Sequence, residues 1–94
     1  MARELSDGHS EAVALSNEAL IHDATGNPQR ALDIYYKART ISRTFADQPE
    51  EATALNNIGS VYRELGAADR AREYYQQALG IWEKIGDDQG RSRI

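Results

Sequence analysis

The chain repeats itself with a period of 40 residues, and this period restricts its fold more than any single motif does. Residues 11–50 align with residues 51–90 without a gap, and 12 of the 40 aligned positions are identical. The first members of the identical pairs are Glu11, Ala12, Ala14, Leu15, Asn17, Gly26, Arg30, Ala31, Tyr35, Ala38, Ile41 and Asp47. Similarity at such a spacing is typical of stacked repeats, which bury their core between neighbouring units.

Each repeat is predicted to contain two helices joined by a tight turn. In the second repeat, apolar residues recur at steps of three and four along residues 55–65 and again along residues 71–85. This spacing is helical, because a strand would alternate with a period of two. Gly66 stands between the two stretches, where a left-handed residue ends a helix, and Gly26 has the same place in the first repeat. We expect Gly86 to end the last helix.

The repeat register divides the chain into four segments. Residues 1–10 are predicted to be the end of a preceding repeat helix plus a linker. Residues 11–50 and 51–90 are the two repeats, and residues 91–94 are predicted to be the start of a further repeat or a disordered tail. Neither end resembles the polar capping helices that close a solenoid, which favours an internal slice of a longer array.

The amino-acid composition argues against several classes of function. The chain has 15 acidic and 11 basic residues, a net charge of −4 and no basic run, which argues against nucleic acid or an anionic membrane as a partner. It has no cysteine, which excludes disulfides and thiolate metal sites and favours a cytoplasmic location. No stretch is apolar enough to span a membrane. No catalytic constellation, phosphate-binding glycine loop or metal-ligand set is visible, so we expect no enzyme activity and no cofactor.

The second repeat resembles a tetratricopeptide repeat. The residues that carry the resemblance are Leu55, Ile58, Gly59, Tyr62, Ala71, Tyr75 and Ala78. Gly59, Ala71 and Ala78 are small, which would let the two helices approach closely. The resemblance implies an all-α fold of antiparallel helix-turn-helix units, stacked as a right-handed α-solenoid of two units. The usual proline near the repeat end is missing, and the 40-residue period is similar to that of kinesin light chains and bacterial regulator arrays.

The first repeat departs further from the family pattern. Glu18, Ala19 and His22 replace the residues that the second repeat has at positions 58, 59 and 62. Glu18 and His22 are four residues apart and could pair as a pH-sensitive contact. The interpretation that we favour is an atypical first helix whose packing partner is missing or polar. His9 is expected to be solvated in the linker.

The resemblance also implies a concave groove, lined by the first helix of each repeat, that binds a protein or peptide. Asn17 and Asn57 are similar to family asparagines that hydrogen-bond the backbone of an extended peptide, which suits an amide because it both donates and accepts. They could instead bond neighbouring helix ends and set the repeat spacing. The other candidate groove residues are Val13, Leu20, Thr53, Asn56, Ser60 and Arg63, with Ser16, Asp23 and Glu64 on the same faces.

Arg63 is the candidate for gripping a carboxylate or a carbonyl, because its fork favours bidentate contacts. The more ordinary alternative is a solvated arginine paired with Glu64 or Asp23.

The aromatic residues have ordinary explanations, with one exception. Tyr35, Tyr62 and Tyr75 occupy the aromatic core positions of the repeat, so core packing is favoured over base stacking. Trp82 has Ser42 as its counterpart, so the repeat does not require a large side chain there. We expect Trp82 to be exposed as part of an adhesive edge.

Three functions follow, in order of preference. The first is a protein–protein interaction scaffold that binds a partner segment in the groove. The second is a self-association module that forms homodimers through uncapped solenoid ends, by stacking or by exchanging helices. The third, more remote, is a sensor segment of a multidomain regulator or enzyme.

Overall fold

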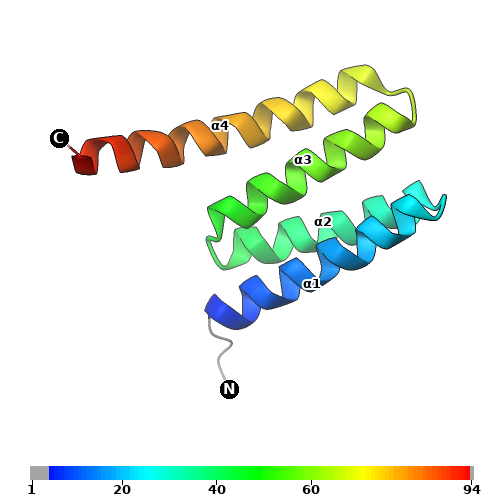
Figure 1. Ribbon diagram of the computed structural model, residues 1–94, viewed down its shortest axis with the longest axis horizontal. Coiled ribbons are helices and arrows are strands. Elements are labelled where there is room, and N and C mark those ends of the chain that lie inside the picture. Colours follow the sequence, from blue (N-terminus) through cyan, green and yellow to red (C-terminus); the bar gives the residue numbers. More distant parts are fainter. Residues whose placement is uncertain (1–4, 94) are drawn as a thin grey trace.

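The computed structural model describes residues 5–93, and it describes side chains for residues 7–86. Four α-helices follow one another: α1 (Leu5–Ala24), α2 (Pro28–Thr44), α3 (Gln48–Glu64) and α4 (Ala68–Arg93). Figure 1 shows them as a row of antiparallel helices in which chain neighbours lie side by side. The described chain has no strand. The predicted all-α stack of helix pairs is therefore confirmed.

The helices pack as two pairs that are stacked on each other. α1 pairs with α2, α3 pairs with α4, and α2 packs on α3, while α1 also touches α3. The dimensions are 45 × 37 × 16 Å, so the molecule is a slab rather than a sphere. In such a slab, much of the surface of every helix is exposed to solvent. A residue can contact a partner only if it lies on one of these exposed helix faces.

The helix ends carry residues that suit them. Pro28 and Pro49 lie in the first turns of α2 and α3, where a missing N–H costs nothing. Glu51 lies in the first turn of α3, and Arg43 in the last turn of α2. The Arg43 Nε donates a hydrogen bond to Glu51 Oε2 at 3.0 Å. Both charges also oppose the partial charge of their own helix end.

The 40-residue period is reproduced in the backbone of the two turns within the repeats. Gly26 and Gly66 have φ angles of 86° and 82°. The Gly26 N–H donates to the carbonyl of Asp23 at 3.2 Å, and the Gly66 N–H donates to the carbonyl of Arg63 at 3.1 Å. Both predicted turns are therefore confirmed, including the left-handed glycine that each requires.

The turn between the repeats has the same form without a glycine. Ala46 has a φ angle of 55°, a left-handed conformation that costs a residue with a Cβ about 1–2 kcal/mol. The Asp47 N–H donates to the carbonyl of Ser42 at 2.8 Å. The ring of Phe45 lies against Gly8 of α1, where an added Cβ would be 2.6 Å from Phe45 Cγ. The packing of α1 thus holds this turn in place.

The core is built largely from small residues and a few large ones. Ala12, Ala38 and Ala54 form one fully buried cluster where α1, α2 and α3 meet. A larger cluster joins both repeats; its buried members are Ala19, Ala31, Leu32, Ile34, Tyr35, Ile58 and Val61. Ala71 and Ala78 of α4 are also buried. The expectation that small residues allow close helix approach is confirmed.

Three tyrosines from three helices also join the repeats. The Tyr36 hydroxyl is hydrogen-bonded to the Tyr62 hydroxyl at 2.7 Å and to the Tyr74 hydroxyl at 3.0 Å. The rings of Tyr62 and Tyr74 stack with their centroids 5.6 Å apart. Burial, followed by these two hydrogen bonds, raises the pKa of Tyr36 well above its usual value of 10.0. The phenol therefore stays neutral and continues to act as donor and acceptor.

Both outer segments differ from the expectation. α1 runs unbroken from Leu5 to Ala24, so within residues 5–10 there is no linker and no separate preceding helix. α4 continues through Gly86 to Arg93, so the helix end predicted at Gly86 is wrong. The physical reason lies in tertiary contacts. Ala46 is the position equivalent to Gly86 in the first repeat, and the chain turns there because the neighbouring Phe45 packs on α1. Gly86 has no such contact, since a Cβ added to it would meet nothing within 4 Å. Residues 1–4 and 94 lie outside the described chain.

Candidate partner-binding face

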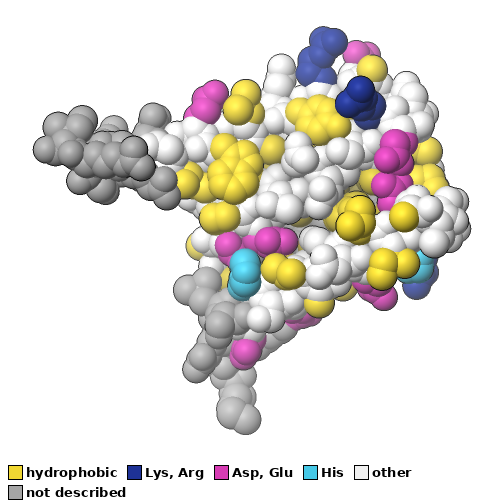
Figure 2. Space-filling model, in the orientation of Figure 1, with side chains coloured by type: hydrophobic (Ala, Val, Ile, Leu, Met, Phe, Trp, Pro, Cys, Tyr) yellow, Lys and Arg dark blue, Asp and Glu magenta, His cyan; other side chains and the backbone are white. Residues whose placement is uncertain are grey.

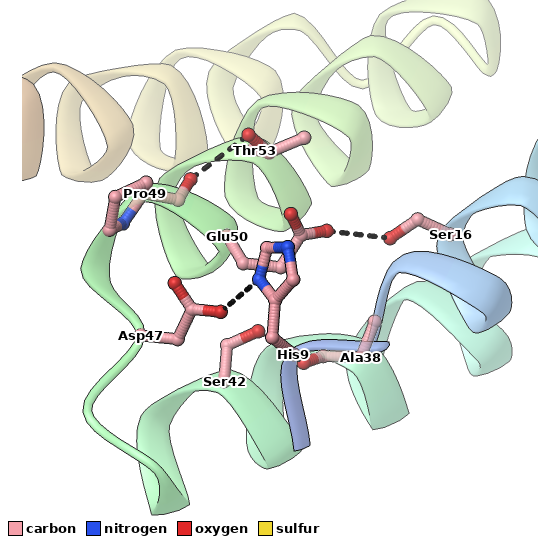
Figure 3. A network of polar contacts seen from close by, with 8 residues as sticks. All are labelled: His9, Ser16, Ala38, Ser42, Asp47, Pro49, Glu50 and Thr53. Carbon is pink, nitrogen blue, oxygen red and sulfur yellow. Dashed lines mark hydrogen bonds and ion pairs between the residues drawn. The ribbon is translucent and has the colours of Figure 1, made fainter. Parts of the chain in front are cut away.

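The first helices of the two repeats, α1 and α3, lie beside each other and share one face. The Ser16 hydroxyl of α1 donates to Glu50 Oε1 of α3 at 3.5 Å (Figure 3). Near the other end of the helices, the carboxyl groups of Asp23 in α1 and Glu64 in α3 are neighbours. A hydrogen bond between them is the main cause that raises the pKa of Glu64 above 4.5. We call the surface between these two contacts the α1–α3 face.

The predicted groove residues recur on each helix at steps of about three and four, which is the spacing of neighbours on one side of a helix. Asn17 and Leu20 are exposed on α1, with Leu20 57% accessible. The remaining six residues lie as follows: Val13, Asn57 and Ser60 are half-buried, and Thr53, Asn56 and Arg63 are exposed. Ser16, expected on the same face, is instead buried against α3 by its bond to Glu50.

The two repeat-related asparagines have unused amides. Within the described chain, neither Asn17 nor Asn57 makes a side-chain hydrogen bond, and neither is a buried polar group without a partner. The bonds to neighbouring helix ends that a spacing role would need are therefore not formed among these residues. Each amide keeps a donor and an acceptor available at equivalent places one repeat apart.

Two other predicted residues have their hydroxyls engaged. The Thr53 hydroxyl donates to the carbonyl of Pro49, one turn earlier, at 2.9 Å (Figure 3). The hydroxyls of Ser60 and Tyr75 are hydrogen-bonded at 3.1 Å. These residues shape the face, but their polar groups are less free than the asparagine amides.

The face leads into an open hollow at the end where α3 turns into α4. Ser60, Arg63, Glu64 and Tyr75 line it. A second hollow adjoins it, because Arg63 and Tyr75 also line that one. In Figure 2 most of the visible basic side chains lie near this end of the molecule, beside hydrophobic ones. Within the described chain Arg63 makes no ion pair, so the expected pairing with Glu64 or Asp23 is not formed.

Tyr75 is a lining residue that the sequence assigned to the core. Its ring packs beside Gly59, as the repeat pattern requires, but its other side faces the hollow. Trp82 is 45% accessible, which confirms its expected exposure. A sequence signal for the hollow exists in the comparison of repeats, since Arg72 stands where the first repeat has the buried Leu32.

A second polar group lies at the opposite end of the face. His9 of α1 is hydrogen-bonded through Nδ1 to Asp47 Oδ2 at 2.5 Å, with Glu50 beside it (Figure 3). The hydrogen bond to Asp47, and then its charge, raise the pKa of His9 above 6.5. Burial is the main cause that raises the pKa of Glu50 above 4.5. His9 thus belongs to α1 rather than to a linker and is paired with Asp47, while its side chain remains exposed to solvent as expected. Among the described residues, Glu18 and His22 form no such pair.

Other kinds of site are not apparent in the described part of the chain. No three histidine, cysteine, aspartate or glutamate residues within it are placed to hold a metal ion. None of its helices combines the length and apolarity needed to cross a membrane.

The fold and this face define a class of protein: stacked antiparallel helix pairs with an accessible face along the first helices. A family model described as the tetratricopeptide repeat matches residues 10–84 and also residues 50–93. The chain belongs to the tetratricopeptide repeat family. The family is generally a protein–protein interaction module that binds proteins or peptides, and it is typically a non-enzymatic scaffold. No curated protein and no solved structure matches the chain significantly.

Proposed function

We propose that the α1–α3 face binds an extended segment of a partner protein, and that Asn17 and Asn57 contact the backbone of that segment. The observation that carries the proposal is the pair of free amides at equivalent places on neighbouring first helices. A peptide backbone offers a carbonyl and an N–H at regular intervals, and a primary amide can bond both groups. The absence of cysteine supports a cytoplasmic setting for this interaction.

Neighbouring side chains would supply the specificity. The exposed Leu20 offers an apolar contact beside Asn17. Arg63 lies at the hollow without an ion pair, so its guanidinium can take a carboxylate of the partner. Asp23 and Glu64, whose carboxyls are close together, would favour a positive charge at the same end. We therefore expect a segment with mixed charge rather than a purely basic or acidic one.

The asparagines can be tested with a peptide selected from a random display library against the intact protein. We expect Asn17→Ala and Asn57→Ala each to weaken binding by about fivefold to thirtyfold, because each loses a hydrogen-bonding amide worth about 1–2 kcal/mol. Isothermal titration calorimetry would give the affinities. Gln77→Ala is the matched control, because it removes an exposed amide from α4.

Two results would contradict this function. One is an unchanged affinity of the Asn57→Ala protein for the selected peptide. The other is a set of amide shift changes in an NMR titration that avoids α1 and α3 and lies on α2 and α4 only.

A further inference from the structure

The interface between the two repeats provides a template for a second interface. α3 covers the first helix pair with Ile58 and Val61, which are buried in the same cluster as Leu32 and Tyr35 of α2. Ala54 of α3 is buried as well, against α1 and α2. The first repeat thus presents a surface that receives a first helix, and α3 is the helix that it receives.

The second repeat presents the same surface, but no described helix covers it. Ala71, Arg72 and Tyr75 are the counterparts of Ala31, Leu32 and Tyr35. Together with the exposed Leu79 they line the second of the two hollows described above, which we call the α3–α4 hollow. Tyr35 is 2% accessible under α3, whereas Tyr75 is half-buried. The hollow is therefore the uncovered equivalent of an interface that the molecule already contains.

α1 presents the complementary surface. The counterparts of the buried Ala54, Ile58 and Val61 are Ala14, Glu18 and Ile21, and all three are exposed. Ile21 is 63% accessible, although Val61 at the same place in α3 is 1% accessible. α1 thus carries, facing solvent, the helix face that α3 uses to cover a repeat.

We propose that two copies of this chain associate head to tail, with α1 of one copy seated in the α3–α4 hollow of the other. The charges of the two surfaces support this occupant. Superposing the repeats brings Glu18 to the place of Ile58 and Arg72 to the place of Leu32. Ile58 and Leu32 belong to one buried apolar cluster, and in the proposed contact charged residues of opposite sign take their two places.

In this arrangement Glu18 pairs with Arg72 across the contact, and Ile21 packs near Ala71 and Tyr75 of the other copy. The contact joins two different surfaces, so each copy can make it twice and the association can continue from copy to copy. The residues that define it, at positions 18 and 72, are not groove residues of the proposed function. Either proposal can therefore fail without the other.

Two charge reversals and their mixture test the contact. Glu18→Arg places two positive charges at every contact between identical copies, and Arg72→Glu places two negative ones. We expect each variant alone to associate at least about tenfold more weakly than the wild type, because like charges replace a pair. An equimolar mixture restores opposite charges at each contact between unlike copies, so its association should return to within about threefold of wild type.

Sedimentation velocity over a concentration series would measure these affinities, and circular dichroism would confirm that each variant remains helical. Asp33→Arg is the control, because it makes the same change of charge on an exposed position of α2. It should leave association unchanged. A wild type that stays monomeric at the highest concentration would overturn the proposal. So would single variants that associate like the wild type, or a mixture that stays dissociated.

Discussion

At the scale of single residues, two of the helical glycines, Gly59 and Gly80, have opposite surroundings. A Cβ added at Gly59 would lie 2.9 Å from Tyr75 Cε1 and 3.2 Å from the carbonyl oxygen of Ala71. A Cβ added at Gly80 would meet nothing within 4 Å. Gly59 is therefore a requirement of the α3–α4 contact, whereas Gly80 only weakens its helix.

We expect Gly59→Ala to lower the free energy of unfolding by about 1–3 kcal/mol, because the backbone of α4 must move to admit the methyl group. Gly80→Ala should raise it by about 0.5–1 kcal/mol, because alanine loses less backbone freedom in a helix. Urea unfolding followed by circular dichroism would measure both. Equal effects of the two substitutions would show that helix propensity, rather than close packing, decides these positions.

At the scale of helices and turns, the start of α1 is fastened to the turn between the repeats. The Phe45 ring packs on Gly8, and His9 bonds Asp47. Asp47 and Glu50 are the charged groups that raise the pKa of His9, and both belong to the turn or to the first turn of α3. The contact therefore links the two repeats through a histidine, a side chain that gains or loses its charge with pH.

This contact makes stability depend on pH in a predictable direction. The folded-state pKa of His9 is raised above 6.5, so the paired imidazolium stabilises the fold fully below about pH 6.5. That contribution is lost as the pH rises through the raised pKa. We expect the urea midpoint to fall across this range, and His9→Gln to abolish the fall. NMR titration of the imidazole protons would give the pKa directly.

His22→Gln serves as the control, because His22 has no ion pair within the described chain. It should keep the wild-type dependence on pH. A dependence that disappears in the His22→Gln protein but persists in the His9→Gln protein would contradict the assignment.

At the scale of the whole molecule, stability depends on the contact between two repeats that each bury little alone. The hydroxyl of Tyr36 is central to that contact, because it bonds both Tyr62 and Tyr74 of the second repeat. Tyr62 and Tyr74, in contrast, each have one such bond. The three rings keep their packing when a single hydroxyl is removed.

We expect Tyr36→Phe to lower the free energy of unfolding by about 0.5–1.5 kcal/mol, because two hydroxyls lose their shared partner. Tyr62→Phe removes only one bond, so its effect should be smaller. Thermal and urea unfolding of the three proteins would establish the order. A larger loss for Tyr62→Phe would show that the trio is not organised around Tyr36.

Several features could be predicted from local residues. Period-3.6 apolar positions indicated the helix pairs, and Gly26 and Gly66 indicated their turns, because these signals depend only on neighbours in the chain. The bond between His9 and Asp47 could not be predicted, since it joins residues of different helical units whose packing no local signal records. The stop expected at Gly86 failed because a glycine permits a turn without requiring one.

Local residue patterns specify the repeating unit of the fold: two helices, a glycine turn and small residues at the close contacts, at intervals of 40 positions. Contacts between helices select which face of each helix is buried and which stays exposed. Tyr35 and Tyr75 occupy equivalent positions in the two repeats, yet Tyr35 is buried and Tyr75 lines a hollow. The physical reason is that burial belongs to a residue's neighbours in space, and α3 covers Tyr35 while no described helix covers Tyr75.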